Sequence, residues 1–263
     1  MLRCLWPAHY LSYDRIGRNS NLLFCILIDF AVRLPDFICI GAQKSGTTWL
    51  YGQISNHPQV FMQNKELDFF FRSDDLQLYA QNFEGASSSQ LCGDISPNYA
   101  AFVGLEEKIH AACPDARIIK ILRNPVDRAF SQWKMARNLG NIPLELSFIE
   151  SFRMGLQYMK RRGEYIAIIE EYSKYYRLND RLAVFWYDDI RDRPGDLLER
   201  AMTFIGVDAG WRSPRIHEVF WRSPEPDVVI NPEDALEIKT YYKPFDDQLR
   251  SLLRVDRLPW DAG

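Results

Sequence analysis

The stretch FICIGAQKSGTTWL, residues 37–50, joins a short apolar run to a loop that contains two glycines. Residues 37–40 are apolar and rich in β-forming side chains, and Gly41 follows them directly. An apolar run of this kind, bounded by a turn residue, is typical of a buried strand in a parallel sheet. The pattern therefore predicts a strand over residues 37–40, a loop from Gly41, and a helix from about Thr48.

The loop from Gly41 to Gly46 has the Walker A spacing, with four residues between its glycines and hydroxyl side chains around the second. Backbone N–H groups of such a turn, with the N-terminus of a helix behind them, form a site for an anion. A nucleoside triphosphatase has lysine directly after the second glycine. In this chain Thr47 stands there, and the lysine is Lys44, inside the loop. The loop therefore predicts a phosphate site without the usual arrangement for a magnesium–triphosphate ligand.

The same alternation of strand and helix recurs along the chain. Strand patterns cover residues 116–122 and 182–186, and helix patterns cover residues 148–159, 164–176 and 194–205. Strands separated by helices indicate a parallel sheet that is covered on both faces. The predicted fold class is α/β, with a P-loop-like central parallel sheet flanked by helices. Ligands of such sheets bind at the carboxyl ends of the strands.

A second anion site is predicted where the strand at residues 116–122 ends. Arg123 follows that strand, Pro125 suits the first position of the next helix, and Ser131 lies two turns into it. An arginine at a strand end can bind a phosphate through two parallel hydrogen bonds. Ser131 reaches the same phosphate if the ligand lies along the start of the helix. Together with the loop at Lys44, this motif indicates a ligand with two separated phosphates.

Residues 44–50, KSGTTWL, resemble the 5′-phosphosulfate loop of the sulfotransferases that use 3′-phosphoadenosine 5′-phosphosulfate (PAPS). Residues 123–131, RNPVDRAFS, resemble the 3′-phosphate motif of the same family. The resemblance implies that PAPS is the co-substrate. It also implies that Lys44 contacts the bridging oxygen and the 5′-phosphate, while Arg123 and Ser131 bind the 3′-phosphate. The other cofactor-binding residues that it implies are Ser45, Gly46, Thr47, Thr48, Trp49 and Tyr165.

Two further segments resemble the acceptor side of this family. Residues 65–70, KELDFF, are similar to the Lys-Glu-x-His-Phe-Phe segment of heparan-sulfate-type and related bacterial sulfotransferases, which implies that Glu66 is the general base. Asp68 stands where many relatives have histidine, so the proton-transfer network near the base differs. Residues 93–99, GDISPNY, resemble the stretch that lines the acceptor cleft. Asp94 is therefore a second candidate catalytic carboxylate, and a turn at a strand end is its alternative role.

The composition is that of a globular protein, since 47% of the 263 residues are hydrophobic and 25% are charged. The net charge of −3 gives no overall field that attracts nucleic acid or an anionic membrane. The five cysteines form no CxxC pair, which favours reduced thiols in a cytoplasmic protein without a metal site. The apolar run at residues 22–28 is too short to span a bilayer. We expect one sulfotransferase domain over residues 34–263, after an N-terminal segment, residues 1–33, without a clear role.

The sequence does not identify the acceptor of the sulfuryl group. The acceptor can be a small molecule, a glycan or a carrier-bound group, sulfated on oxygen or nitrogen. Ile95 stands where heparan-sulfate-type relatives often have lysine, which argues against a strongly anionic glycosaminoglycan. No basic glycine-rich loop that would close over the 3′-phosphate is recognisable, and His217 and Arg222 are interpreted as surface charges. A P-loop nucleotide or small-molecule kinase is the alternative function, and the oligomeric state is open.

Overall fold

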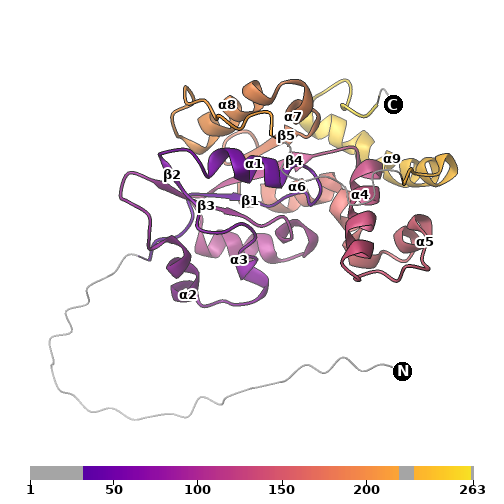
Figure 1. Ribbon diagram of the computed structural model, residues 1–263, viewed down its shortest axis with the longest axis horizontal. Coiled ribbons are helices and arrows are strands. Elements are labelled where there is room, and N and C mark those ends of the chain that lie inside the picture. The colour runs from indigo at the N-terminus through magenta and orange to yellow at the C-terminus, as the bar shows by residue number, and fades with distance from the viewer. Residues whose placement is uncertain (1–31, 219–227, 262–263) are drawn as a thin grey trace, which may run out of the picture. The chain divides into compact units, whose positions relative to one another are not determined.

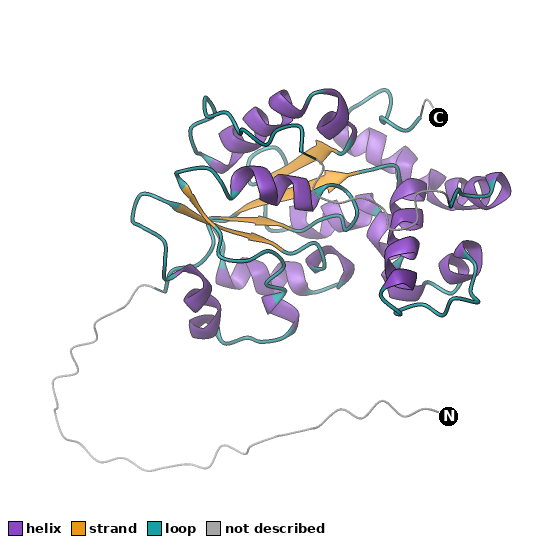
Figure 2. Ribbon diagram, in the orientation of Figure 1, coloured by secondary structure: helices purple, strands orange, loops and turns teal. Residues whose placement is uncertain are grey.

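The computed structural model describes residues 32–218 and 228–261, which form a parallel sheet with helices on both faces (Figures 1 and 2). The five strands lie in the order β2-β3-β1-β4-β5, and every pair is parallel. The strands are β1 (Phe37–Cys39), β2 (Val60–Phe61), β3 (Leu91–Ile95), β4 (Arg117–Leu122) and β5 (Leu182–Trp186). The predicted α/β class with a central parallel sheet is confirmed. Residues 1–31 of the predicted N-terminal segment lie outside the described residues.

The two faces of the sheet pack against different helices. Ile119 and Ile121 of β4 share an apolar core with α1 (Thr47–Ile54) and α8 (Pro194–Ile205). Ile118 and Leu122 belong to the opposite core, with α3 (Leu105–Ala112) and α6 (Tyr165–Ser173). This division follows from the strand geometry, because successive side chains of a strand point to opposite faces.

A third apolar cluster joins helices beyond the edge of the sheet. It contains Trp133 of α4, Phe148 of α5 and Tyr242 of α9. The bounds of the remaining helices are α2 (Leu76–Ala80), α4 (Pro125–Asn138), α5 (Phe148–Arg153), α7 (Asp188–Asp192) and α9 (Pro232–Leu253). None of the helices in the described ranges is long and apolar enough to cross a membrane.

Several predicted boundaries agree with the structure. β5 and α8 cover the residues that the sequence predicts, and Pro125 is the first residue of α4. The side-chain oxygen of Asn124 accepts a hydrogen bond from the N–H of Val126 over 3.0 Å. This bond caps α4 at its N-terminus, directly after Arg123. The start of α4 is therefore fixed next to the predicted second anion site.

The helix predicted over residues 148–159 is wrong in its second half. α5 ends at Arg153, and Gly155 has a left-handed φ of 66°. A left-handed glycine shortly after the last turn is a common way to end a helix. Gln157 also has a positive φ, of 53°, and its main-chain oxygen accepts a hydrogen bond from Nε2 of Gln132 over 2.7 Å. A tertiary contact to α4 therefore outweighs the local helical pattern.

β4 carries a buried lysine near the centre of the sheet. The side chain of Lys120 has no exposed surface, and none of the described residues accepts a hydrogen bond from its Nζ. Burial lowers the pKa of this amine to about 7. Its Nζ lies 5.6 Å from the centroid of the Tyr165 ring. A protonated Lys120 destabilises the fold, because burial removes the charge from water without a hydrogen-bonded partner.

We expect Lys120→Met to stabilise the protein most strongly at low pH. Below about pH 7 the amine is protonated in the folded and the unfolded chain, so folding buries a charge. Between that pH and the ordinary pKa of 10.5, only the unfolded chain keeps the proton, so the free energy of unfolding of the wild type rises with pH. Thermal unfolding should therefore show a larger gain for the variant at about pH 6 than at about pH 9.5. An equal gain in melting temperature at the two pH values would contradict the conclusion that Lys120 is buried and loses its proton near pH 7.

Candidate functional site

A cavity of about 800 Å³ lies at the carboxyl edge of the sheet. Residues that follow four of the strands line it: Lys44 after β1, Pro97 after β3, Arg123 after β4 and Tyr187 after β5. This is the edge at which parallel α/β sheets bind their ligands. The two anion motifs that the sequence predicts therefore meet in one cavity.

The loop between β1 and α1 takes its shape from main-chain hydrogen bonds to β4. The N–H of Ala42 donates to the oxygen of Ile121 over 2.9 Å, and the N–H of Ile121 donates to the oxygen of Gly41 over 2.6 Å. Gly46 has a φ of 87°, and a Cβ at this position would lie 2.2 Å from Cδ1 of Ile190. The left-handed backbone favours glycine there, and a side chain would also have to displace the tip of Ile190 on α7.

Lys44 is the cation of this loop. Its own φ is 68°, and its Nζ donates to Sδ of Met135 on α4 over 3.7 Å. Burial and, as a smaller cause, the charge of Arg123 together lower the pKa of the amine to about 8. An anion bound in the cavity would have the opposite effect and favour the ammonium form.

Arg123 connects the two anion motifs directly. Its Nη1 donates to the main-chain oxygen of Lys44 over 2.9 Å. Its guanidinium carbon lies 4.4 Å from the centroid of the Tyr187 ring, within the range of a cation–π contact. The hydroxyl of Tyr165 donates to the main-chain oxygen of Arg123 over 2.7 Å. Because a guanidinium has five N–H donors, the bond to Lys44 leaves others for a phosphate.

The other predicted cofactor residues divide into two groups. Those that line the cavity are Gly46, Thr47, Thr48, Trp49 and Ser131. Ser45 and Tyr165 are buried and are not part of the lining. The structure therefore places Tyr165 behind the site, where it acts on Arg123 through the main chain.

Glu66 reaches the cavity from the loop after β2. It has a positive φ, of 63°, and its N–H donates to the oxygen of Ile95 over 2.9 Å, at the end of β3. Its carboxylate forms an ion pair with Lys65 and is 42% exposed. Glu66 lines the same cavity as Lys44. The structure thus brings the predicted base and the predicted loop lysine to one site, where the carboxylate is open to an incoming group.

Asp94 does not reach the cavity. It is the fourth residue of β3 and has no exposed surface. Its Oδ1 accepts a hydrogen bond from Oγ of Ser96 over 2.6 Å, and its Oδ2 accepts from the hydroxyls of Tyr79 and Tyr99 over 2.8 and 2.9 Å. Burial raises the pKa of the carboxyl to about 6. Asp94 lies in the strand itself and not in a turn, and its contacts favour a supporting role over proton transfer.

Asp68 and Ser96 hold the turn that carries Glu66. The N–H of Asp68 donates to Oγ of Ser96 over 2.9 Å. Oδ2 of Asp68 accepts from the amide of Asn98 over 2.8 Å, and Arg162 donates to the same amide over 2.8 Å. Burial raises the pKa of Asp68. The residue that replaces the histidine of many relatives is therefore built into a polar network beside the base.

Sequence reasoning did not identify several lining residues of the cavity. They are Lys134, Met135, Leu139, Tyr187, Ile190 and His217. Lys134 and Met135 follow Ser131 by three and four positions, so the helical period could have predicted them. His217 is exposed, as the sequence predicts, and it also lines the cavity. Nε1 of Trp49 donates to the oxygen of the neighbouring Ile216 over 3.2 Å and holds that segment at the cavity. Arg222 lies outside the described residues.

Ile95 gives no information on the acceptor. Its side chain has no exposed surface and belongs to the core beneath α1. Only its main-chain oxygen contributes to the site, through the bond to Glu66. The sequence argument that Ile95 disfavours an anionic acceptor therefore has no support in the structure.

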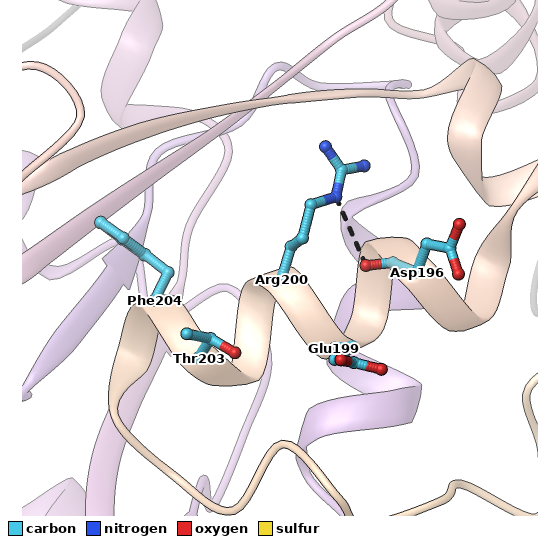
Figure 3. Close-up of a pocket in the computed structure, with 5 residues that line it drawn as sticks. All are labelled: Asp196, Glu199, Arg200, Thr203 and Phe204. Carbon is cyan, nitrogen blue, oxygen red and sulfur yellow. Dashed lines mark hydrogen bonds between the residues drawn. The ribbon is translucent and has the colours of Figure 1, made fainter.

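A second cavity, of about 420 Å³, lies along α8 and contains none of the predicted site residues (Figure 3). Its labelled lining residues all come from that helix. Arg200 is the cation among them, and its guanidinium forms an ion pair with Asp189. Because this charge is already paired, the α8 cavity offers no anion site comparable to the one at Lys44 and Arg123.

A model of the family described as the sulfotransferase domain matches residues 34–219 of the chain. The chain belongs to the PAPS-dependent sulfotransferase family. The matched region contains all five strands, the loop at Lys44, and the segment that carries Arg123 and Ser131. The resemblance of the motifs is therefore confirmed at the level of the family.

Two curated relatives illustrate how far the similarity extends. Human heparan sulfate glucosamine 3-O-sulfotransferase 6 is 29% identical over 184 residues, which are 66% of this chain and 53% of that protein. Membrane-associated sulfotransferase kil1 of Dictyostelium discoideum is 33% identical over 125 residues, 44% of this chain and 26% of that protein. The chain spans about half the length of the first relative and about a quarter of the second.

Solved sulfotransferase structures share the fold. The sulfotransferase of Alicyclobacillus acidocaldarius superimposes with a TM-score of 0.74 at 25% identity, over 86% of this chain and 98% of that one. The sulfotransferase domain from the curacin biosynthetic pathway gives a TM-score of 0.52 at 16% identity, over 80% of this chain and 98% of that one. The second likeness concerns the fold alone.

We expect Arg123→Ala to weaken the binding of adenosine 3′,5′-bisphosphate (PAP) while the fold is retained. Arg123 is half-buried at the cavity, so its truncation leaves no hole in an apolar core. Hydrogen bonds to charged groups contribute about 1.5–3 kcal/mol each, so the loss should be tenfold or more in affinity, by an order-of-magnitude estimate. Titration calorimetry measures the affinity, and Arg123→Lys is the control that keeps the charge but not the planar fork. An Arg123→Ala protein that is unfolded by circular dichroism would make the residue structural and contradict the assignment.

Proposed function

We propose that this protein transfers the sulfuryl group of PAPS to a hydroxyl or amine of an acceptor, with Lys44 at the leaving oxygen and Glu66 as the general base. One observation carries the proposal: Lys44, Arg123 and Glu66 come from three separate segments and line the same cavity. A volume of about 800 Å³ is in the range of ligand pockets. The arrangement offers two cationic positions for the phosphates and a carboxylate for the acceptor.

In the proposed reaction the acceptor oxygen attacks the sulfur in line with the leaving group. A bond forms between the acceptor and sulfur, the bond from sulfur to the bridging oxygen breaks, and PAP leaves with its electron pair. The proton of the acceptor passes to Glu66. Negative charge gathers on the leaving oxygen, where the ammonium of Lys44 stabilises the transition state more than the ground state.

The acceptor side of the cavity fits more than one class of molecule. Pro97, Met135 and Leu139 give the cavity as a whole apolar surface, and Lys134 adds a cation to its lining. The human relative is named for heparan sulfate, and the same chemistry on a small molecule, another glycan or a carrier-bound group needs only a hydroxyl near Glu66. Transfer from PAPS to a panel of alcohols, phenols, amines and sugars identifies the class. A cytoplasmic location and independence from metal remain predictions from the sequence.

A P-loop kinase is the alternative function, and the loop chemistry disfavours it. Thr47 occupies the position at which a nucleoside triphosphatase has its lysine. The second cation is Arg123, which lies after β4 and outside the loop. Two separated cationic positions suit a nucleotide with phosphates on two different carbons of the ribose better than one continuous triphosphate.

We expect PAP to raise the melting temperature of the protein, while AMP and ATP raise it weakly. PAP presents one phosphate to the loop at Lys44 and one to Arg123, whereas AMP and ATP lack the second. A ligand at 100 times its dissociation constant stabilises a protein by roughly 2.7 kcal/mol. Thermal unfolding with each nucleotide at equal concentration tests this. Equal shifts from AMP and PAP would contradict a 3′-phosphate site at Arg123, and a dominant shift from magnesium–ATP would favour the kinase.

We expect Glu66→Gln to bind PAP normally and to lose roughly 10²-fold or more of its turnover. Glutamine keeps the size of the side chain and one hydrogen bond but cannot take a proton. Lys44→Ala should harm both PAP affinity and turnover, because the ammonium touches the phosphosulfate before and during transfer. Turnover is measured with PAPS and a hydroxyl acceptor, since an amine can lose its proton without a base.

Asp94→Asn is the matched control for Glu66→Gln. This variant replaces a carboxylate that is buried away from the cavity. The turnover of the Asp94→Asn protein should therefore be lowered only in proportion to the fraction that is unfolded. If Glu66→Gln kept near-normal turnover while a folded Asp94→Asn were inactive, Asp94 and not Glu66 would be the general base.

A further inference from the structure

Lys120 directly precedes Ile121, the residue of β4 that is hydrogen-bonded to the phosphate loop. Its neighbour Ile121 exchanges main-chain hydrogen bonds with Gly41 and Ala42, at the start of that loop. The side chain of Lys120 lies on the face of the sheet opposite to that of Ile121, next to the core that contains Tyr165 of α6. The amine is therefore behind the loop and not in the cavity that the loop lines.

Arginines predominate among the charged groups that act on this amine. The titratable and charged groups that act on it are Cys39 on β1, Arg128 on α4, Arg161 and Arg162 in the turn before α6, and Tyr165 on α6. Arg161 is itself paired with the carboxylates of Glu164 and Glu171. Within residues 32–218 and 228–261, no carboxylate forms an ion pair with Lys120 or with Arg128. Arg128 instead donates to neutral oxygens, those of the Gln132 side chain and the Met159 main chain.

A short chain of contacts joins Lys120 to both anion positions. Its Nζ lies 5.6 Å from the Tyr165 ring centroid, and the Tyr165 hydroxyl donates to the main-chain oxygen of Arg123. Nη1 of Arg123 donates to the main-chain oxygen of Lys44. Charges that are a few residues apart in a protein interior interact more strongly than they would in water, because the effective dielectric constant is lower. A ligand with two phosphates at Lys44 and Arg123 would therefore bring negative charge toward Arg128 and Arg162, which form no ion pair with any carboxylate of the described residues.

We propose that Lys120 is a further positioning residue of the nucleotide site, which takes up a proton when a nucleotide with 3′- and 5′-phosphates fills the cavity. This inference rests on the proposed function. In the empty protein, the neutral amine avoids repulsion with the surrounding guanidinium groups. In the filled site, the phosphates compensate that repulsion, and the ammonium adds a positive charge behind the loop. The affinity for the nucleotide therefore falls as rising pH makes the proton scarcer.

Two kinds of group other than Lys120 can exchange protons during binding. The pKa of Lys44 is lowered to about 8 by burial, so it also gains protons when an anion binds. The phosphate groups of the nucleotide have a second pKa of about 6, so they exchange protons mainly near that pH. Burial lowers the pKa of Lys120 to about 7, so at about pH 8 it is mostly neutral in the empty protein. The difference between the wild type and a Lys120 variant at that pH isolates its contribution.

The test is calorimetric titration of PAP into the full chain at about pH 8, in two buffers with different enthalpies of ionisation. The dependence of the heat on the buffer gives the number of protons taken up per PAP. Lys120→Met should still bind PAP but take up fewer protons than the wild type, by roughly half to one proton. Its affinity should also fall less steeply between about pH 7.5 and pH 9. Lys174→Met, at an exposed lysine at the end of α6, is the matched control and should keep the full uptake.

Lys120→Leu provides a second apolar variant in case methionine does not fit the core. Equal proton uptake by the wild type and by a folded, PAP-binding Lys120 variant would overturn the role of Lys120 and leave the proposed function intact. Absence of PAP binding in the wild type would overturn the proposed function, and the proton linkage with it.

Discussion

The guanidinium of Arg123 donates a hydrogen bond over 2.9 Å to the main-chain oxygen of Lys44, and this bond ties two distant parts of the sequence into one anion site. It is possible because β1 and β4 are neighbours in the parallel sheet, so that the segments after them leave the same edge side by side. The main-chain bonds between Ile121 and the Gly41–Ala42 pair keep the loop in register with β4. The two predicted phosphate positions therefore lie after two adjacent strands of the sheet.

The sequence predicted the features that depend on local chemistry. The glycines, the lysine and the hydroxyls of residues 41–48 indicate an anion loop because few other functions need them together, and Pro125 predicts the start of α4 because its ring suits only the first turn. The sequence did not predict the end of α5, where Gln157 bonds to α4, or the place of His217 at the cavity. Both depend on contacts between segments far apart in the chain, which no local pattern records.

Two carboxylates that the sequence treats alike have different surroundings in the structure. Glu66 stands on a strained turn, close to half exposed, next to the cavity. Asp94 is enclosed by three hydroxyl donors and has a raised pKa, because burial disfavours its charge. Its network continues through Ser96 to the turn that carries Glu66. The Glu66 carboxylate is therefore open to the cavity, whereas Asp94 is buried and helps to hold the turn on which Glu66 stands.

The account is tested most directly by a crystal structure of the protein in complex with PAP. The account predicts that the 5′-phosphate lies in the loop at residues 43–48 with Nζ of Lys44 beside it. The 3′-phosphate should contact the Arg123 guanidinium and the Ser131 hydroxyl, and Glu66 should face the open end of the 5′-phosphate. Binding of PAP with its 3′-phosphate away from Arg123, or outside this cavity, would contradict it.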